Sequence, residues 1–293
     1  MVKPQEFSIE FAGRTLSVSV GQLAQQANGS CVVRYGDTVA LCTATLGEAR
    51  EDAGFFPLSV DFEERMYAAG RIKGSRFIKR EGRPTDEAIL SGRLIDRAIR
   101  PLFPSNLRNE VAVVATVFSH DQENDADIPG LIGASCALAI SNIPWNGPIA
   151  AVRVGRKNGN FILMPTYADI DTGELDLVVA GTTDKTLMVE AGANCVPEEI
   201  ALEAMKFAHA YLSPIIDLIN QVKTAVGKQK INLDAPKNEE DAAKRAELQV
   251  LHDKVSTFLS TKQGILFAEP LKSKADRKAA VARLKKEVEA YLI

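Results

Sequence analysis

The sequence predicts an α+β protein in which β layers pack against helices (a βαβα type of core), followed by a small all-α region. Three observations support this class. The first sixty residues alternate between apolar and polar positions, as strands with one buried face do. A helical period then takes over, and strand-like and helical segments recur once in the same order. Beyond residue 240 the chain is rich in Ala, Lys, Glu and Leu, with apolar residues at helical spacing.

The first strand-like segments are short and rich in alternating apolar residues. They cover residues 7–11, 16–20, 32–35, 38–45 and 56–62. Gly36 and Asp37 lie between two of these segments and are typical of the turn of a β-hairpin. We therefore expect the opening of the chain to form an antiparallel β layer.

A helix is predicted from Thr85 to Arg100. The Thr85 side chain can cap its first turn, and Asp86 and Glu87 suit the positive end of the helix dipole. Pro101 stops the helix, because proline has no backbone N–H to continue it.

The rest of the core repeats the same elements. Residues 111–118 are strand-like and residues 128–140 suit a buried helix, and further strands are predicted at 149–154, 161–165, 175–180 and 186–190. A single helix is then predicted from Pro197 to about Val222.

A polar stretch around residues 228–239 is typical of a linker. We therefore expect a core domain over residues 1–230 and an all-helical domain over residues 231–293. The apolar stripe of the last helix ends without a capping signal, so we expect this helical domain to be truncated.

The charge of the chain is concentrated in one segment. The 293 residues carry a net charge of −3, which by itself gives no sign of nucleic-acid or membrane binding. Residues 65–108 hold 11 basic and four acidic residues, so this segment carries +7 and the remainder −10. A concentrated basic segment in a mildly acidic protein indicates a local anion site.

The first part of the basic segment is a glycine-punctuated loop over residues 70–84, in which six basic residues surround Phe77 and Ile78. This pattern suits single-stranded nucleic acid, because phosphates meet the cations while a base stacks on the ring. The alternative, with equal weight on composition alone, is a solvated loop whose charges lie in water.

The second part of the basic segment is a stripe on one face of the predicted helix. Its members are Arg93, Arg97 and Arg100. Ile95 and Ile99 point roughly the opposite way, toward the core. Three arginines in a row can bind phosphates bidentately, and the alternative is a surface helix with internal charge pairs. Because Asp96 is the only acid beyond the first turn, we expect the stripe to be under-neutralised, which favours an anionic partner.

Two clusters of carboxylates are candidates for a cation site. They are Asp121, Glu123, Asp125 and Asp127 and, further on, Asp169, Asp171, Glu174 and Asp176. The first cluster lacks the glycine and the distant glutamate of a calcium loop, so a solvated loop is favoured. The second surrounds a turn, and ordinary turn chemistry is favoured there.

Cysteine and histidine give no sign of a metal site. The four cysteines, at positions 31, 42, 136 and 195, have no metal-ligand or redox spacing and stand among apolar or small residues. We expect buried free thiols, which fit a reducing compartment. No signal-peptide or membrane-spanning stretch is visible, so we expect a cytoplasmic protein with no membrane partner.

Several stretches of the sequence match one known pattern. They are AGRI (69–72), FIKREGRP (77–84), RLIDR (93–97), RPLFP (100–104), IGAS (132–135), NGPI (146–149) and LDLVVAGT (175–182). Taken together they closely resemble the bacterial polynucleotide phosphorylase family over residues 1 to about 230, and the helical tail agrees in type.

The resemblance implies a fold and an activity. The family joins two RNase PH-like core domains by a helical segment and assembles as a trimeric ring with a central channel. It degrades single-stranded RNA from the 3′ end with inorganic phosphate as co-substrate, releasing nucleoside diphosphates, in mRNA turnover. By resemblance, this chain is the first core plus most of the helical segment, and RNA-degradosome components are potential partners.

The resemblance also implies where the chemistry lies. The family's catalytic residues and its Mg²⁺ belong mainly to the second core, where an acid is followed two positions later by a lysine. Here Asp176 is followed by Leu177 and Val178, while Glu174 remains an acid. We therefore expect no catalytic and no metal-binding residue in this chain. The residues expected to bind RNA are Phe77, Lys79, Arg80, Arg83, Arg93, Arg97 and Arg100.

Two other functions stay open at this point. One is a non-catalytic module that binds single-stranded RNA. The other is a stand-alone RNase PH-type enzyme that trims tRNA 3′ ends, against which the helical tail argues.

Overall fold

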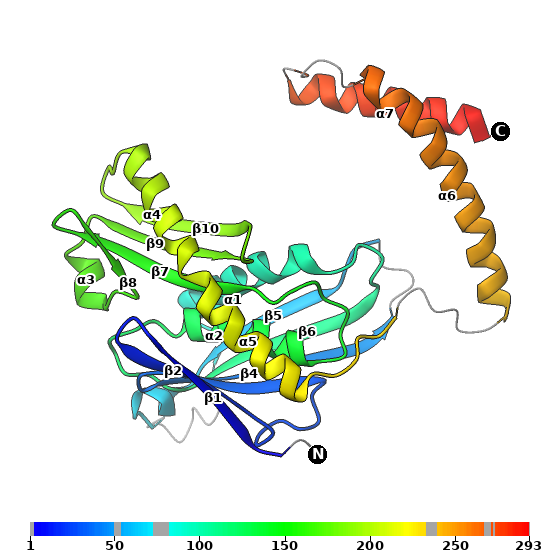
Figure 1. The fold of residues 1–293 in the computed structure, drawn as a ribbon. Coiled ribbons are helices and arrows are strands. Elements are labelled where there is room, and N and C mark those ends of the chain that lie inside the picture. Colours follow the sequence, from blue (N-terminus) through cyan, green and yellow to red (C-terminus); the bar gives the residue numbers. More distant parts are fainter. Residues whose placement is uncertain are drawn as a thin grey trace. The chain divides into compact units, whose positions relative to one another are not determined.

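The computed structural model describes residues 3–49, 54–72, 82–232, 239–266, 271 and 273–292. The chain divides into two compact units, Met1–Leu233 and Asp234–Ile293 (Figure 1). The α+β class predicted from the sequence is confirmed, because the first unit combines two sheets with helices and the second is helical.

The larger sheet of the first unit has six strands in the order β1-β2-β3-β4-β6-β5. The strands are β1 (Gln5–Phe11), β2 (Arg14–Val20), β3 (Gly29–Tyr35), β4 (Thr38–Ala49), β5 (Leu58–Glu64) and β6 (Asn109–Ser119). The predicted hairpin is confirmed, since β3 and β4 pair antiparallel with Tyr35 opposite Thr38.

The expectation of a purely antiparallel layer is wrong for one strand. β5 is an edge strand that pairs parallel with β6. The chain between them passes through helix α1 (Asp86–Ile99), and a helical crossover returns the chain in the same direction. Alternation of apolar residues cannot reveal this, because it shows which face of a strand is buried and not which strand lies beside it.

The smaller sheet has four antiparallel strands in the order β10-β9-β7-β8. They are β7 (Ala150–Lys157), β8 (Asn160–Leu163), β9 (Leu175–Gly181) and β10 (Thr186–Ala193). A short helix, α3 (Tyr167–Asp171), follows β8 and begins with a capping box between Thr166 and Asp169.

Helix α2 (Asp127–Ile140) lies between the two sheets and is buried along its whole length (Figure 1). This confirms the buried helix predicted from the sequence. Its glycines allow close packing: a Cβ at Gly133 would lie 2.4 Å from the Cys42 sulfur, inside contact distance. Helix α2 therefore packs against both sheets, and its N-terminal end lies between them.

Helix α1 begins and ends as predicted. Thr85 is its N-cap and accepts a hydrogen bond from the Ala88 N–H at 3.0 Å. Ile95 and Ile99 are fully buried, and the chain continues after Ile99 into a short 3₁₀ helix that contains Pro101.

The single helix predicted from Pro197 to Val222 is two helices, α4 (Glu198–Ala210) and α5 (Leu212–Val226). Pro214 explains the break, because in a continuous helix its ring would clash with the Ala210 carbonyl. In the observed structure Pro214 lies in the first turn of α5, where a proline is tolerated.

The thiol prediction holds for three of four cysteines. Cys31, Cys42 and Cys136 are buried, whereas Cys195 is exposed in the loop before α4. In the second unit, α6 (Glu239–Leu266) and α7 (Lys274–Leu292) are the helices predicted beyond residue 240. They contact each other through stacked rings of Phe258 and Tyr291. In the part of the chain that is described, no helix is long and apolar enough to cross a membrane.

Candidate nucleic-acid interface

The arginine stripe lies on α1, but most of its charge is already paired. Arg100 donates to the Asp96 carboxylate at 2.9 and 2.6 Å and also to the carbonyls of Phe56 and Leu58. Arg97 donates to Glu190 at 2.7 Å and to the Val189 carbonyl at 3.2 Å. The expectation of an under-neutralised stripe is therefore wrong for these two arginines. Glu190 comes from β10, 93 residues further along the chain, and spacing within the helix could not reveal it.

Arg93 is the remaining arginine of the stripe. It is exposed and forms no ion pair with any residue that the structure describes. It lines a groove of about 330 Å³ between α1 and the edge strand β5, together with Asp61 and Gly92. Gly92 allows this close approach, because a Cβ there would lie 3.2 Å from the Val60 carbonyl oxygen. Of the three stripe arginines, Arg93 is thus the one placed to bind an external anion.

The segment just before the glycine-punctuated loop lies beside the C-terminal end of that loop. A cavity of about 240 Å³ is lined by Arg65 and Met66 from the segment before the loop and by Gly82 and Arg83 from its C-terminal end. Arg83 is exposed. The other predicted RNA-binding residues, Phe77, Lys79 and Arg80, lie outside the described residues. The structure therefore brings Arg83 and Arg93 to the same edge of the larger sheet, on either side of Thr85.

The expectation of a solvated acidic loop before α2 holds for Glu123, which is exposed, and is wrong for Asp121, Asp125 and Asp127, which are at least partly buried in ion pairs. Three carboxylates surround the guanidinium of Arg153 on β7: Asp125 at 2.9 Å, Asp176 at 3.0 Å and Asp127 at 3.8 Å. The Arg153 side chain is 15% exposed and that of Asp127 only 5%. We call these four residues the Arg153 cluster. Asp176 reaches it from the second carboxylate cluster, so the two clusters of the sequence meet in space.

Four of the remaining five acids also have partners, whereas Asp171 is exposed and pairs with no described residue. Arg14 on β2 pairs with Asp121 at 3.3 Å and with Glu123. Arg156 pairs with Glu174. Asp169 completes the capping box of α3, so the turn chemistry favoured for it is confirmed.

Burial and charge act together on the Arg153 cluster. Burial, and then the nearby charge of Asp125, raise the pKa of Asp127 to about 7. Burial also raises the pKa of Asp176, although the Arg153 charge opposes the shift. The cluster carries one cation against three carboxyls, so the Asp127 carboxyl is the group that takes up a proton.

The N-terminus of α2 is occupied by its own carboxylates. The Ile128 N–H donates to Asp127 at 2.6 Å and the Asp127 N–H donates to Asp125 at 3.3 Å. A helix N-terminus is otherwise a ready anion site. Here the carboxylates fill it, and an incoming phosphate would meet negative charge.

The Arg153 cluster does not fit a metal ion. Its guanidinium stands where the three carboxylates converge, which is the place that a cation would need. Among the described residues, no group of three or more His, Cys, Asp or Glu side chains is arranged to hold a metal.

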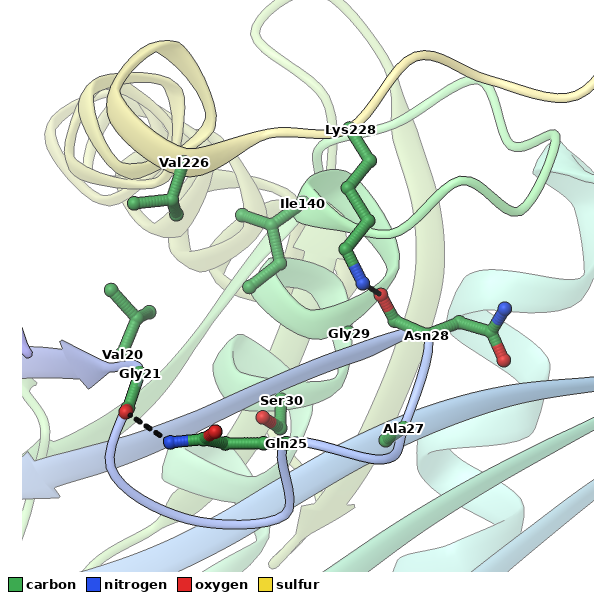
Figure 2. A pocket seen from close by; sticks show the side chains of 10 residues that line it. All are labelled: Val20, Gly21, Gln25, Ala27, Asn28, Gly29, Ser30, Ile140, Val226 and Lys228. Atoms are coloured by element: carbon green, nitrogen blue, oxygen red, sulfur yellow. Dashed lines mark hydrogen bonds between the residues drawn. The ribbon is translucent and has the colours of Figure 1, made fainter. Parts of the chain in front are cut away.

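A further pocket, of about 420 Å³, lies near the opposite end of α2 (Figure 2). Val20, Ile140 and Val226 form apolar walls, and the Lys228 ammonium donates to the Asn28 carbonyl at 2.6 Å. Two residues further on, Lys230 donates to two carbonyls at the end of α2, and burial lowers its pKa to about 8. Through these hydrogen bonds the two lysines hold the segment after α5 against the core. The pocket therefore lies where that segment packs on the core.

The Arg153 cluster makes a prediction about stability. Because the pKa of Asp127 is raised in the folded state, the folded protein binds this proton more tightly than the unfolded chain. Its contribution to the free energy of unfolding is therefore complete below pH 4 or so, near the ordinary pKa of an aspartate, and is lost as the pH rises through about 7. Denaturant unfolding at a series of pH values should show a steeper loss for the native chain than for Asp127→Asn.

Asp217→Asn, which changes an exposed carboxyl on α5, is the matched control and should keep the native pH profile. An Asp127→Asn profile parallel to that of the native chain would show that Asp127 does not titrate in this range.

Comparison with known proteins places this geometry in a family. Residues 12–144 match the model of the 3′ exoribonuclease family, domain 1, and residues 147–211 match domain 2 of the same family. The division falls where the structure passes from α2 to the smaller sheet. Rice (Oryza sativa) Rrp46 has the same fold, with a TM-score of 0.57 at 14% identity over 74% of this chain and 93% of its own.

The curated relatives carry one name. A polyribonucleotide nucleotidyltransferase of Heliobacterium modesticaldum is 55% identical over 227 residues, which is 77% of this chain and 32% of the relative. That of Bacillus pumilus is 46% identical over 282 residues, covering 96% of this chain and 38% of the relative. The chain thus spans about a third of the length of these relatives. With both domains matched over one continuous RNase PH-like fold, the chain belongs to the 3′ exoribonuclease family.

Proposed function

We propose that this chain is part of a phosphorolytic 3′-to-5′ exoribonuclease and guides single-stranded RNA without cleaving it. In the intact protein, an oxygen of inorganic phosphate attacks the last phosphodiester phosphorus in line. The bond to the 3′ oxygen of the preceding nucleotide breaks, and the terminal nucleotide leaves as a nucleoside diphosphate. The shared name of the curated relatives supports this reaction for the whole protein.

The observation that carries the non-catalytic role is the Arg153 cluster. Phosphorolysis needs cations that hold phosphate and offset the charge of the transition state. In this chain the Arg153 guanidinium is already paired with three carboxylates, and the N–H groups at the start of α2 donate to Asp125 and Asp127. The positions after Asp176 offer no cation, since Leu177 and Val178 are both buried apolar residues.

The need of the reaction for Mg²⁺ also supports a non-catalytic role for this chain. The Arg153 cluster does not fit Mg²⁺, because a guanidinium already stands among its carboxylates. We therefore assign the Mg²⁺ and the bound phosphate of the reaction to another part of the intact protein. We accordingly propose that no residue of this chain is catalytic or binds a metal ion.

RNA binding is assigned to the cationic edge beside α1 and β5. Arg83 and Arg93 would contact phosphates directly, since both are exposed and Arg93 has no ion pair among the described residues. Phe77, Lys79 and Arg80 keep their proposed RNA role from the sequence. Arg97 and Arg100 are positioning residues in this proposal, because their guanidinium groups bind Glu190, Asp96 and backbone carbonyls.

The cellular location, assembly and partners of the intact protein are proposed from its sequence motifs. It would act in the cytoplasm in mRNA turnover as a homotrimeric ring, with RNA-degradosome components as partners. The stand-alone tRNA-trimming enzyme is disfavoured, because such an enzyme would need a free anion site, whereas Arg153 is paired with carboxylates of this chain.

The purified chain should release no nucleoside diphosphate from polyadenylate when supplied with inorganic phosphate and Mg²⁺. Chromatography of the products at increasing phosphate concentrations measures this directly. Phosphate-dependent release of ADP by the pure chain would contradict the guiding role and would support the trimming enzyme.

Changing Arg83 and Arg93 together to Ala should weaken binding of a short oligoadenylate. Losing two phosphate contacts on a single strand should also lower the slope of log K against log salt by about 1.4. Fluorescence anisotropy at several salt concentrations gives both quantities.

Arg108→Ala is the matched control, because Arg108 belongs to the same basic segment but donates to the backbone carbonyls of Ser105 and Leu107. An unchanged salt slope in the double variant, or an equal change in Arg108→Ala, would reject the phosphate contacts.

A further inference from the structure

An exposed aromatic ring stands at the base of the cationic loop. Tyr67 lies in a short 3₁₀ helix, Met66–Ala69, that follows β5 and is 55% exposed. Its hydroxyl has no hydrogen-bond partner among the described residues. An exposed tyrosine ring offers a flat apolar face that another flat group can cover.

The backbone holds this ring in a fixed place. The Arg71 N–H donates to the Met66 carbonyl and the Gly70 N–H to the Tyr67 carbonyl, both at 3.0 Å, which closes the turn as a Schellman motif. Gly70 takes the left-handed conformation that this motif requires, with φ of 66°. The His120 N–H donates to the Ala68 carbonyl at 3.0 Å and ties the turn to the chain after β6.

A second ring supports the first. The Phe118 ring near the end of β6 lies 6.5 Å from that of Tyr67, with 53° between the planes. This contact supports one side of the tyrosine and leaves its remaining surface in solvent. A ring fixed in this way loses little conformational entropy when another flat group stacks on it.

The charges around Tyr67 suit a polyanion. Arg71 follows the turn and is exposed, and Arg83 lies across the small cavity from Met66. The nearby carboxylates are engaged: Glu63 accepts from Arg65 and Thr116, and Glu64 accepts from Thr85 at 2.8 Å. Phosphate-binding cations therefore lie beside an aromatic face, which is the combination that single-stranded nucleic acid uses.

We propose that Tyr67 is a stacking platform for one nucleobase of single-stranded RNA entering along the cationic edge of this core. The inference rests on the proposed RNA-guiding function and adds to it a contact with a base, where the arginines contact phosphates. Because every base has a flat π face, the platform accepts any sequence. Base stacking of this kind strengthens binding without adding an ion pair.

The test compares an oligoadenylate with an abasic ribose-phosphate chain of the same length, using the full chain. Tyr67→Leu should weaken oligoadenylate binding about tenfold, since the stacking contact is lost. Binding of the abasic chain and the salt slope should stay as in the native protein, because no phosphate contact changes. Tyr67→Phe keeps the ring and should bind both probes normally.

Phe55→Leu is the matched control, because Phe55 is a 68% exposed ring near the other end of β5. It should bind both probes as the native chain does. A 2-aminopurine base in the oligomer should be quenched by the native chain and by Tyr67→Phe, and not by Tyr67→Leu.

The outcomes separate the two proposals. If the native chain binds oligoadenylate and Tyr67→Leu binds it equally well, the platform is overturned while RNA guiding stands. A loss of equal size on the abasic chain would likewise overturn the platform, since it would mean a general structural effect. If the native chain binds neither probe, the RNA-guiding function itself is overturned.

Discussion

Arg153 and its three carboxylates stand at the meeting point of the two sheets, and much of the first unit depends on how they are paired. The guanidinium comes from β7 and the carboxylates from β9 and the N-terminal end of α2, so one ionic cluster joins the smaller sheet to the helix that both sheets share. Arg153 and Asp127 are the most buried members, whereas the side chains of Asp125 and Asp176 are 32% and 29% exposed, so removing either of these costs less than the roughly 3–5 kcal/mol typical of a fully buried pair. The cluster thus links the smaller sheet to α2, and the same pairing occupies the guanidinium that could otherwise bind an external anion.

A second consequence concerns the basic segment. Two of the three stripe arginines, Arg97 on α1 and Arg100 at its C-cap, bind carboxylates and carbonyls that fix the helix against β5 and β10. This leaves the external charge to Arg93 and to the loop. The cationic surface is therefore narrower than the charge count suggests. A narrow row of cations beside an exposed ring suits a strand of RNA that passes along the edge of the core, in keeping with a guiding role.

Local features were predictable from the sequence. The Thr85 cap, the buried face of α1 and the buried helix at residues 127–140 follow from spacing and composition alone. Contacts between distant segments were not: the parallel pairing of β5, the Arg97–Glu190 pair and the Arg153 cluster each join residues that no local pattern relates. The break before α5 could have been anticipated from Pro214. Tyr67 carried no periodic signal, because a 3₁₀ turn of four residues is too short to show one.

The central claim is that Arg153 and the N-terminus of α2 are already occupied by carboxylates of this chain. Titration of the purified chain with inorganic phosphate, followed by the ³¹P line width, tests this without any need for activity. The account predicts no saturable binding at millimolar phosphate, for the native chain and for Arg153→Met alike. Saturable one-to-one binding that disappears in Arg153→Met would contradict it, since it would show that the guanidinium is free to hold phosphate.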